Sequence, residues 1–119
     1  MMASPVAKGR LEELQIYRLL QCIHEGNKLQ IEKLITRGVG NLLNFTEPRQ
    51  GKGAMHLAAV ANNLDMVGFL LSHGASPDVQ DKMGRTPVML AAELGHDGVV
   101  ALLVKHKANM SLLDEEGKG

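Results

Sequence analysis

The stretch that decides the fold occurs twice, first as Gly51-Lys52-Gly53-Ala54-Met55-His56-Leu57-Ala58-Ala59 and then as Gly84-Arg85-Thr86-Pro87-Val88-Met89-Leu90-Ala91-Ala92. The two copies lie 33 residues apart, and the same offset pairs Val67 with Val100, Leu70 with Leu103 and Ala75 with Ala108. The shared positions are mostly apolar or glycine, which indicates that the repeat encodes packing. A fixed period of this length is typical of stacked repeat proteins.

An earlier unit aligns with the middle one at an offset of 36, which places Cys22-Ile23 under Ala58-Ala59. At the other end, the residues from Asp114 to Gly119 resemble the start of the preceding unit, Asp81 to Thr86. We therefore expect that the chain is a piece of a longer repeat protein.

Within each unit the apolar spacing predicts two short helices. Thr86 before Pro87 indicates a helix start, because the hydroxyl can accept from an unpaired N–H and proline fits the first helical position. The first helix of this unit is expected to end near Leu94, and Asp97 is expected to cap the second. In the middle unit Asn62-Asn63 marks the break between helices, and Gly74 is expected to end the second helix in a left-handed conformation.

The first unit is predicted to begin with a longer helix, from Leu11 to His24. A long and more polar helix suits the end of a stack, where one face meets water. The chain has no Trp, one Tyr and two Phe, so its core must be aliphatic. Such a core suits thin helical layers better than a β-sandwich, whose strands favour aromatic and β-branched residues.

These residues resemble the ankyrin-repeat family over about Leu11 to Gly119. The resemblance rests on Gly84-x-Thr86-Pro87-x-x-Leu90-Ala91-Ala92-x-x-Gly95-His96 and on Gly51-x-x-x-x-His56-Leu57-Ala58-Ala59. It implies an all-α ankyrin-repeat helical solenoid, in which helix-turn-helix repeats carry β-turn fingers. It also implies close approach of neighbouring inner helices at four small residues, Ala58, Ala59, Ala91 and Ala92.

The sequence departs from the family pattern at a local hydrogen-bond network of threonine and histidine. The middle unit keeps His56 but has Gly53-Ala54 in place of Thr-Pro, whereas the third keeps Thr86-Pro87 but has Met89 in place of His. Lys107 also replaces the glycine that ends a helix in the family. We expect each missing hydrogen bond to cost on the order of 1 kcal/mol of stability.

The expected organisation is a flexible N-terminus over residues 1–10 and one ankyrin-repeat domain over residues 11–119. That domain divides into a capping repeat (about 11–47), two repeats (48–80 and 81–113) and the start of a further repeat (114–119). Segments such as Asn44 to Pro48 also resemble the N-terminal region of ankyrin-repeat proteins that carry a calcium-binding EF-hand. This chain itself contains no EF-hand loop of regularly spaced acidic residues.

Thirteen Lys and Arg balance thirteen Asp and Glu, so no overall field attracts nucleic acid or an anionic membrane. Without a secretion signal or an apolar membrane span, we expect a cytoplasmic, monomeric protein. The unfinished last repeat leaves an apolar end that could self-associate instead.

The sequence offers little for catalysis or cofactor binding. His73 and His106 recur at one repeat, but no cysteine or carboxylate cluster completes a zinc site, and a histidine near a helix end has a simpler electrostatic explanation. His56 is expected to be a structural hydrogen bonder, and Cys22 a small core residue rather than a nucleophile. We therefore expect no metal, no cofactor and no enzymatic activity.

The resemblance implies a continuous concave surface of finger tips and inner helices that binds another protein. The candidate partner-binding residues are Arg49, Gln50, Lys52, Lys82, Met83, Arg85, Glu93, Leu94 and Glu115, with Val60 and Ala61 also at exposed inner-helix positions. The basic fingers suit a partner with acidic residues, and Met83 and Leu94 would add apolar contact. The simpler alternative is that these charges only keep the surface soluble.

Two functional classes follow from this pattern. The first, which we favour, is a protein-protein interaction module whose partner the sequence does not identify. The alternative is a targeting or regulatory segment of a larger enzyme or of a calcium-responsive EF-hand protein.

Overall fold

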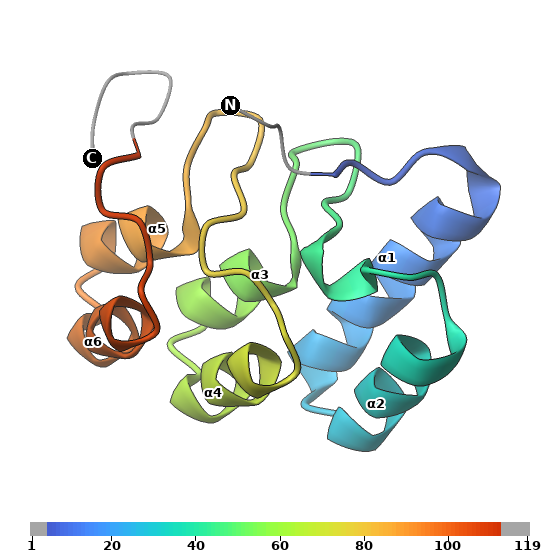
Figure 1. Cartoon of the computed structure of the whole chain (residues 1–119), viewed down its shortest axis with the longest axis horizontal. Helices are drawn as coiled ribbons and strands as arrows, with labels where there is room; N and C mark the ends of the chain where they lie inside the picture. Colours follow the sequence, from blue (N-terminus) through green and yellow to red (C-terminus); the bar gives the residue numbers. More distant parts are fainter. Residues whose placement is uncertain (1–4, 113–119) are drawn as a thin grey trace.

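The computed structural model describes residues 5–112, which form three helix pairs stacked side by side (Figure 1). The pairs are α1 (Gly9–Glu25) with α2 (Lys28–Arg37), α3 (Ala54–Val60) with α4 (Leu64–Ser72), and α5 (Pro87–Glu93) with α6 (Asp97–Lys105). A 3-10 helix, η1 (Leu42–Asn44), lies in the link between the first two pairs. The expected all-α helical solenoid is confirmed.

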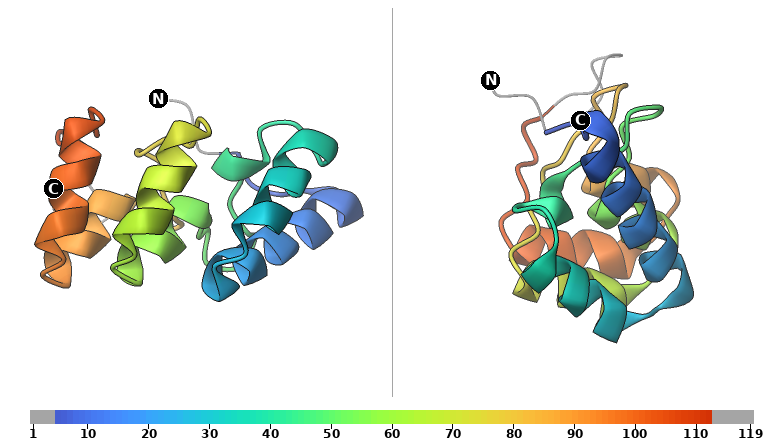
Figure 2. Two further views of the ribbon diagram at one scale, coloured as in Figure 1. Left: turned by 90° about the horizontal axis from the view of Figure 1, so that it is seen from below. Right: turned by 90° about the vertical axis from the view of Figure 1, so that its right-hand side faces the viewer.

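The helices form two rows, with α1, α3 and α5 in an inner row and α2, α4 and α6 in an outer row (Figure 2). Irregular loops lie together on one side of the inner row (Figure 1). These loops are the expected fingers, and the described part measures 35 × 27 × 20 Å along its principal axes.

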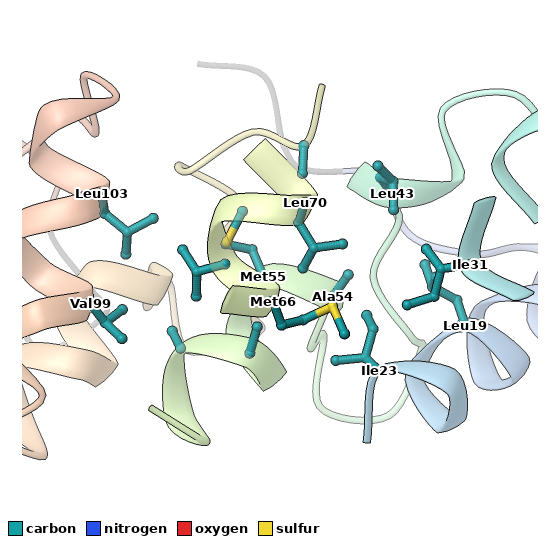
Figure 3. Close-up of a cluster of buried hydrophobic side chains, with 14 of the residues drawn as sticks. Leu19, Ile23, Ile31, Leu43, Ala54, Met55, Met66, Leu70, Val99 and Leu103 are labelled. Carbon is teal, nitrogen blue, oxygen red and sulfur yellow. The ribbon is translucent and has the colours of Figure 1, made fainter. Parts of the chain in front are cut away.

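The core is a continuous aliphatic layer between the two rows (Figure 3). Leu19 on α1 and Ile31 on α2 are fully buried, as are Met55 on α3 and Met66 on α4. Burying one such side chain contributes roughly 1.5–3 kcal/mol. Cys22 is buried in the same layer, as expected of a small core residue.

Side-chain caps set two of the helix starts that the sequence predicted. Thr86 caps α5 by accepting from the Met89 N–H at 3.4 Å, with Pro87 in the first turn. Asn63 caps α4 by accepting from the Met66 N–H at 3.0 Å. Gly74 is left-handed, with φ +90°, as expected. The predicted cap at Asp97 is wrong, because His96 is the N-cap of α6 and Asp97 lies in the first turn.

The expected flexible N-terminus does not hold for residues 5–10. The Thr46 N–H donates to the Pro5 carbonyl and the Ala7 N–H donates to the Thr46 carbonyl, both at 2.9 Å. Ala7 is buried, and α1 begins at Gly9, two residues earlier than predicted. Both hydrogen bonds join this short segment to Thr46, in the link that follows η1. Residues 1–4 lie outside the described part.

The structure partly repairs the incomplete hydrogen-bond network. In repeat three the Met89 sulfur takes the imidazole's place and accepts from the Thr86 N–H at 3.4 Å. Sulfur is a weak acceptor, so this is a poorer bond than a histidine would make. In the middle repeat a Cβ at Gly53 would lie 3.0 Å from the Phe45 carbonyl oxygen, which explains why threonine does not occupy that position.

Lys107 takes the left-handed conformation that glycine takes one repeat earlier, with φ +66°. Left-handed backbone costs an L-residue with a side chain roughly 1–2 kcal/mol, and glycine avoids this cost. We expect Lys107→Gly to raise the free energy of unfolding by about 1 kcal/mol, measured by urea denaturation. The matched control, Ala101→Gly at an exposed position inside α6, should lower it by about 1 kcal/mol. A Lys107→Gly chain no more stable than wild type would contradict the strain argument.

Candidate functional site

The first finger (residues 47–52) is organised by one buried carboxylate. Glu47 accepts hydrogen bonds from the backbone N–H groups of Arg49 at 2.9 Å, Gln50 at 2.7 Å and Lys52 at 3.1 Å. Its side chain is buried, which alone would raise its pKa. The backbone donors, Lys52 first, outweigh burial and hold the pKa of Glu47 below the ordinary value.

The second finger (residues 81–86) has its own buried carboxylate. Asp81 Oδ1 accepts from the N–H groups of Met83 at 2.9 Å and Arg85 at 2.8 Å. Its Oδ2 pairs with the Lys52 ammonium of the first finger and with Arg85 Nε at 3.3 Å. Burial would raise the pKa of Asp81, but the Lys52 hydrogen bond and the other donors hold it below the ordinary value.

The two fingers are joined through their backbones as well. The Lys82 N–H donates to the Gln50 carbonyl at 3.1 Å. Gly51 lies against this contact with φ +75°, and a Cβ there would lie 2.6 Å from the Lys82 nitrogen. Glycine is therefore needed at Gly51 both for its backbone conformation and for the close approach of the second finger.

His56 connects the start of the inner helix α3 to the second finger. Its Nδ1 accepts from the Gly53 N–H at 3.1 Å, and its Nε2 donates to the Arg85 carbonyl at 2.9 Å. Burial is the main cause that lowers the pKa of His56, so the ring is neutral in the folded chain. Below about pH 6.5 the unfolded chain therefore binds a proton that the folded chain does not. The free energy of unfolding consequently decreases as the pH is lowered through this range. His56 is thus a structural hydrogen bonder, as predicted.

The predicted basic fingers are only partly available to a partner. Lys52 and Arg85 are half-buried and share the single carboxylate of Asp81, so their charge is partly neutralised within the chain. Arg49 and Lys82 are exposed and make no ion pair with any residue between 5 and 112. Gln50 and Met83 are exposed beside them. Glu115, like the whole third finger (residues 114–119), lies outside the described part.

The inner helices place the other predicted residues at the surface. Val60 is 42 % exposed and Leu94 is 53 % exposed, and Ala61 and Glu93 are also exposed. Together with the finger residues they make up what we call the finger surface: Arg49, Gln50, Lys82 and Met83 on the fingers, with Val60 and Ala61 at the end of α3 and Glu93 and Leu94 at the end of α5.

One prediction about the small inner-helix residues is wrong. Ala58, Ala59 and Ala91 are buried where inner helices meet, as expected. Ala92 is exposed, because no described helix packs on the far side of α5.

Sequence reasoning missed the roles of Glu47 and Asp81. Each is an acidic residue followed within a few positions by a turn glycine, Gly51 or Gly84, and that is a signal for a carboxylate that accepts from turn N–H groups. Tyr17 was also missed. Its hydroxyl donates to Glu47 Oε2 at 3.3 Å, which connects α1 to the first finger.

The two histidines that recur at one repeat, His73 and His106, make structural contacts. His73 Nδ1 bonds to the Phe69 carbonyl at 2.9 Å, and His106 Nδ1 bonds to the Leu102 carbonyl at 3.0 Å. Both contacts lie at helix ends, as the simpler interpretation predicted. Residues 5–112 contain no group of three histidine, cysteine or acidic side chains that could hold a metal ion. In the same range no helix is long and apolar enough to cross a membrane.

Stacked helix pairs with backbone fingers on one side define a helical-repeat solenoid. The family model for ankyrin repeats (3 copies) matches residues 19–114. The chain therefore belongs to the ankyrin-repeat family, whose repeats are generally protein-protein interaction modules.

Several curated proteins share this segment. The chain is 38 % identical over 65 residues to protein glp-1 of Caenorhabditis elegans, covering 55 % of this chain and 5 % of that protein. It is 28 % identical over 113 residues to the putative E3 ubiquitin-protein ligase XBAT31 of Arabidopsis thaliana, covering 95 % and 24 % respectively. It is 37 % identical over 79 residues to the potassium channel AKT1 of the same plant, covering 66 % and 9 %. The matched segment is thus a quarter or less of each relative.

The Glu47 carboxylate should make stability depend on acid pH. Its pKa is lower in the folded than in the unfolded chain, so its contribution is complete above the unfolded value, about 4.3, and is lost as pH falls through the folded value. We expect Glu47→Gln to lower the free energy of unfolding at pH 7 by roughly 1–3 kcal/mol. The variant should also lose less stability than wild type between about pH 5 and pH 2.

Urea denaturation at several pH values measures both effects. Glu13→Gln, at an exposed position of α1, is the control and should change stability at pH 7 by less than roughly 0.5 kcal/mol. Parallel pH profiles for wild type and Glu47→Gln would show that Glu47 does not organise the finger as an ionised group.

Proposed function

We propose that this chain is a protein-protein interaction module that binds its partner through the finger surface. The observation that carries this proposal is a division of roles among the finger residues. Buried Glu47 and Asp81 hold the finger backbones, so the exposed side chains at the tips are not needed to maintain the fold. Side chains that are exposed on a fixed backbone are free to contribute to recognition.

The charge of the finger surface suggests the chemistry of the partner. Arg49 and Lys82 lie at finger tips whose backbones are hydrogen-bonded to each other, and neither is paired within residues 5–112. Two such cations favour a partner segment with acidic side chains. Met83 and Leu94 add apolar contact that adapts to the partner's shape.

We further propose that this module works without catalysis or a cofactor, as a cytoplasmic monomer that contacts neither nucleic acid nor a membrane. The balance of 13 basic and 13 acidic residues supports the last point. The proposed unit boundaries are residues 11–47, 48–80, 81–113 and the start of a further unit at 114–119. The described helix pairs span residues 9–37, 54–72 and 87–105.

A second candidate is a targeting or regulatory segment of a larger enzyme or EF-hand protein. The lengths of the relatives support this candidate, because the matched region makes up only 5–24 % of each relative. An antibody to this segment, used on an extract of the native cells, gives the mass of the endogenous protein. A species much larger than 12.9 kDa supports this candidate, and calcium-45 overlay then tests for an EF-hand.

The finger surface is tested by reversing its two unpaired charges. We expect the double variant Arg49→Glu and Lys82→Glu to lose proteins that wild type retains in a pull-down from cell extract, identified by mass spectrometry. Purified partner should then bind the variant at least about tenfold more weakly, because an attraction becomes a repulsion. The melting temperature should stay unchanged, because neither side chain is paired within residues 5–112.

The matched control is Lys33→Glu with Arg37→Glu, which reverses two exposed charges on the outer helix α2. This variant should bind the partner as wild type does. If both double variants bind equally well, the finger surface is not the binding site and its charges serve solubility.

A further inference from the structure

The junction between the inner helices α3 and α5 is closed by a histidine. His96, the residue before α6, donates its Nε2–H to the carbonyl of Val60 at 3.1 Å. Val60 is the last residue of α3, so this bond holds the end of one inner helix to the next repeat. The imidazole ring therefore bridges the two repeats at this point.

The preceding junction, between α1 and α3, has the same backbone but lacks the histidine. Asn63 stands at the position of His96 one repeat earlier, with φ −95° and ψ 86° against −84° and 70°. Its shorter side chain turns to its own helix and accepts from the Met66 N–H at 3.0 Å. The residue equivalent to Val60 in the first unit is His24, and among residues 5–112 no side chain donates to its carbonyl.

A hollow of about 150 Å³ lies at the junction between α1 and α3. Ile23 and His24 line it from α1, and Leu57, Ala58 and Val60 line it from α3, with Ala61 and Asn63 completing the wall. Val60 and Ala61 also belong to the finger surface, so the hollow is continuous with it. The hollow is mostly apolar, and its polar groups are at the His24 and Asn63 side.

We infer that this hollow is an anchor pocket for one planar side chain of the partner, an indole ring of tryptophan whose N–H donates to the His24 carbonyl. This inference rests on the proposed function, because it names the group that a partner on the finger surface inserts. The occupant is argued from the chain itself. At the equivalent place, one repeat later, a planar ring with one N–H donor bonds to the equivalent carbonyl.

Size and polarity favour indole over imidazole as the group from the partner. An apolar cavity of about 150 Å³ is large enough to bind a benzene-sized ring. Five of the lining residues, Ile23, Leu57, Ala58, Val60 and Ala61, are apolar, which suits the larger apolar body of indole. Tryptophan is also the residue type that anchors protein interfaces most often, because it buries a large area and keeps one polar N–H.

The test titrates the whole chain with N-acetyltryptophan amide and follows the backbone amide signals by NMR. We expect saturable shifts at Ile23, Leu57 and Ala61 in wild type. The 1-methylindole analogue lacks the N–H donor and should bind about tenfold more weakly, as should 4-methylimidazole, which has the donor but less apolar surface. No saturable shift at these amides, or equal binding of the 1-methylindole analogue, would overturn the inference.

Two variants fill the pocket from within the chain. Asn63→His copies the residue at the closed junction, on a backbone that already matches, and should abolish probe binding. Because this change removes the cap of α4, Ala61→Leu provides a second route. It enlarges a lining residue to the one found at the equivalent position, Leu94, and keeps the cap. Undiminished probe binding in a folded Ala61→Leu chain would overturn the inference.

The reciprocal double variant, His96→Asn with Leu94→Ala, removes both larger side chains from the junction between α3 and α5. It should open a second hollow and produce new probe-dependent shifts at Leu90 and Ala91. Absence of a second site would overturn the comparison of the two junctions. These outcomes are separate from the charge-reversal test, because probe binding needs no partner. If the chain binds the probe but no acidic partner, the anchor pocket is supported and the proposed function of the fingers is contradicted.

Discussion

Each helix pair of this chain completes the burial of its apolar residues against a neighbouring pair. Met55 on α3 and Met66 on α4 are buried in a layer that continues through Ile23 on one side and Val99 on the other (Figure 3). The side chains that fill this layer are aliphatic or small, so the helices approach closely and the core stays thin. A repeat of this kind has no core of its own, and its stability is the sum of its internal contacts and those with its neighbours.

The same requirement explains where the polar connections lie. Many of the hydrogen bonds that involve buried groups join consecutive repeats, such as His56 to the Arg85 carbonyl and Lys52 to Asp81. Two further hydrogen bonds resemble each other and also join consecutive repeats. The Asn44 side chain accepts from the Ser76 N–H, and the Asp78 side chain accepts from the Asn109 N–H, both at 2.7 Å. Loss of one such bond therefore weakens a junction rather than a single repeat.

The fold followed from the sequence because the signal is periodic and local. The offset of 33 residues can be read along the chain, and the Thr86-Pro87 start and the break at Asn62-Asn63 each depend on neighbours within a few positions. The family model match then confirmed the ankyrin resemblance. The misplaced cap at Asp97 shows the limit of local rules, since His96 and Asp97 are adjacent and only the backbone decides which one precedes the helix.

The candidate site was less predictable, because it depends on pairing between repeats. The sequence shows four basic finger residues, but it does not show that Asp81 engages Lys52 and Arg85, or that Arg49 and Lys82 have no ion pair within residues 5–112. The sequence also does not show the hollow between α1 and α3, because its walls come from two segments that are distant in the chain. The burial of Ala7 was missed for a related reason, as its partner Thr46 lies far along the chain.

The contact between Gly51 and Lys82 has a consequence for the energetics of association. Since the finger backbones are bonded to each other, and each is braced by its own carboxylate, the spacing between their tips is set before any partner arrives. Little backbone entropy remains to be lost on binding. The favourable free energy of each contact with a partner therefore contributes to affinity with little offset from ordering the fingers. Differences between partners should then appear mainly in how slowly they dissociate.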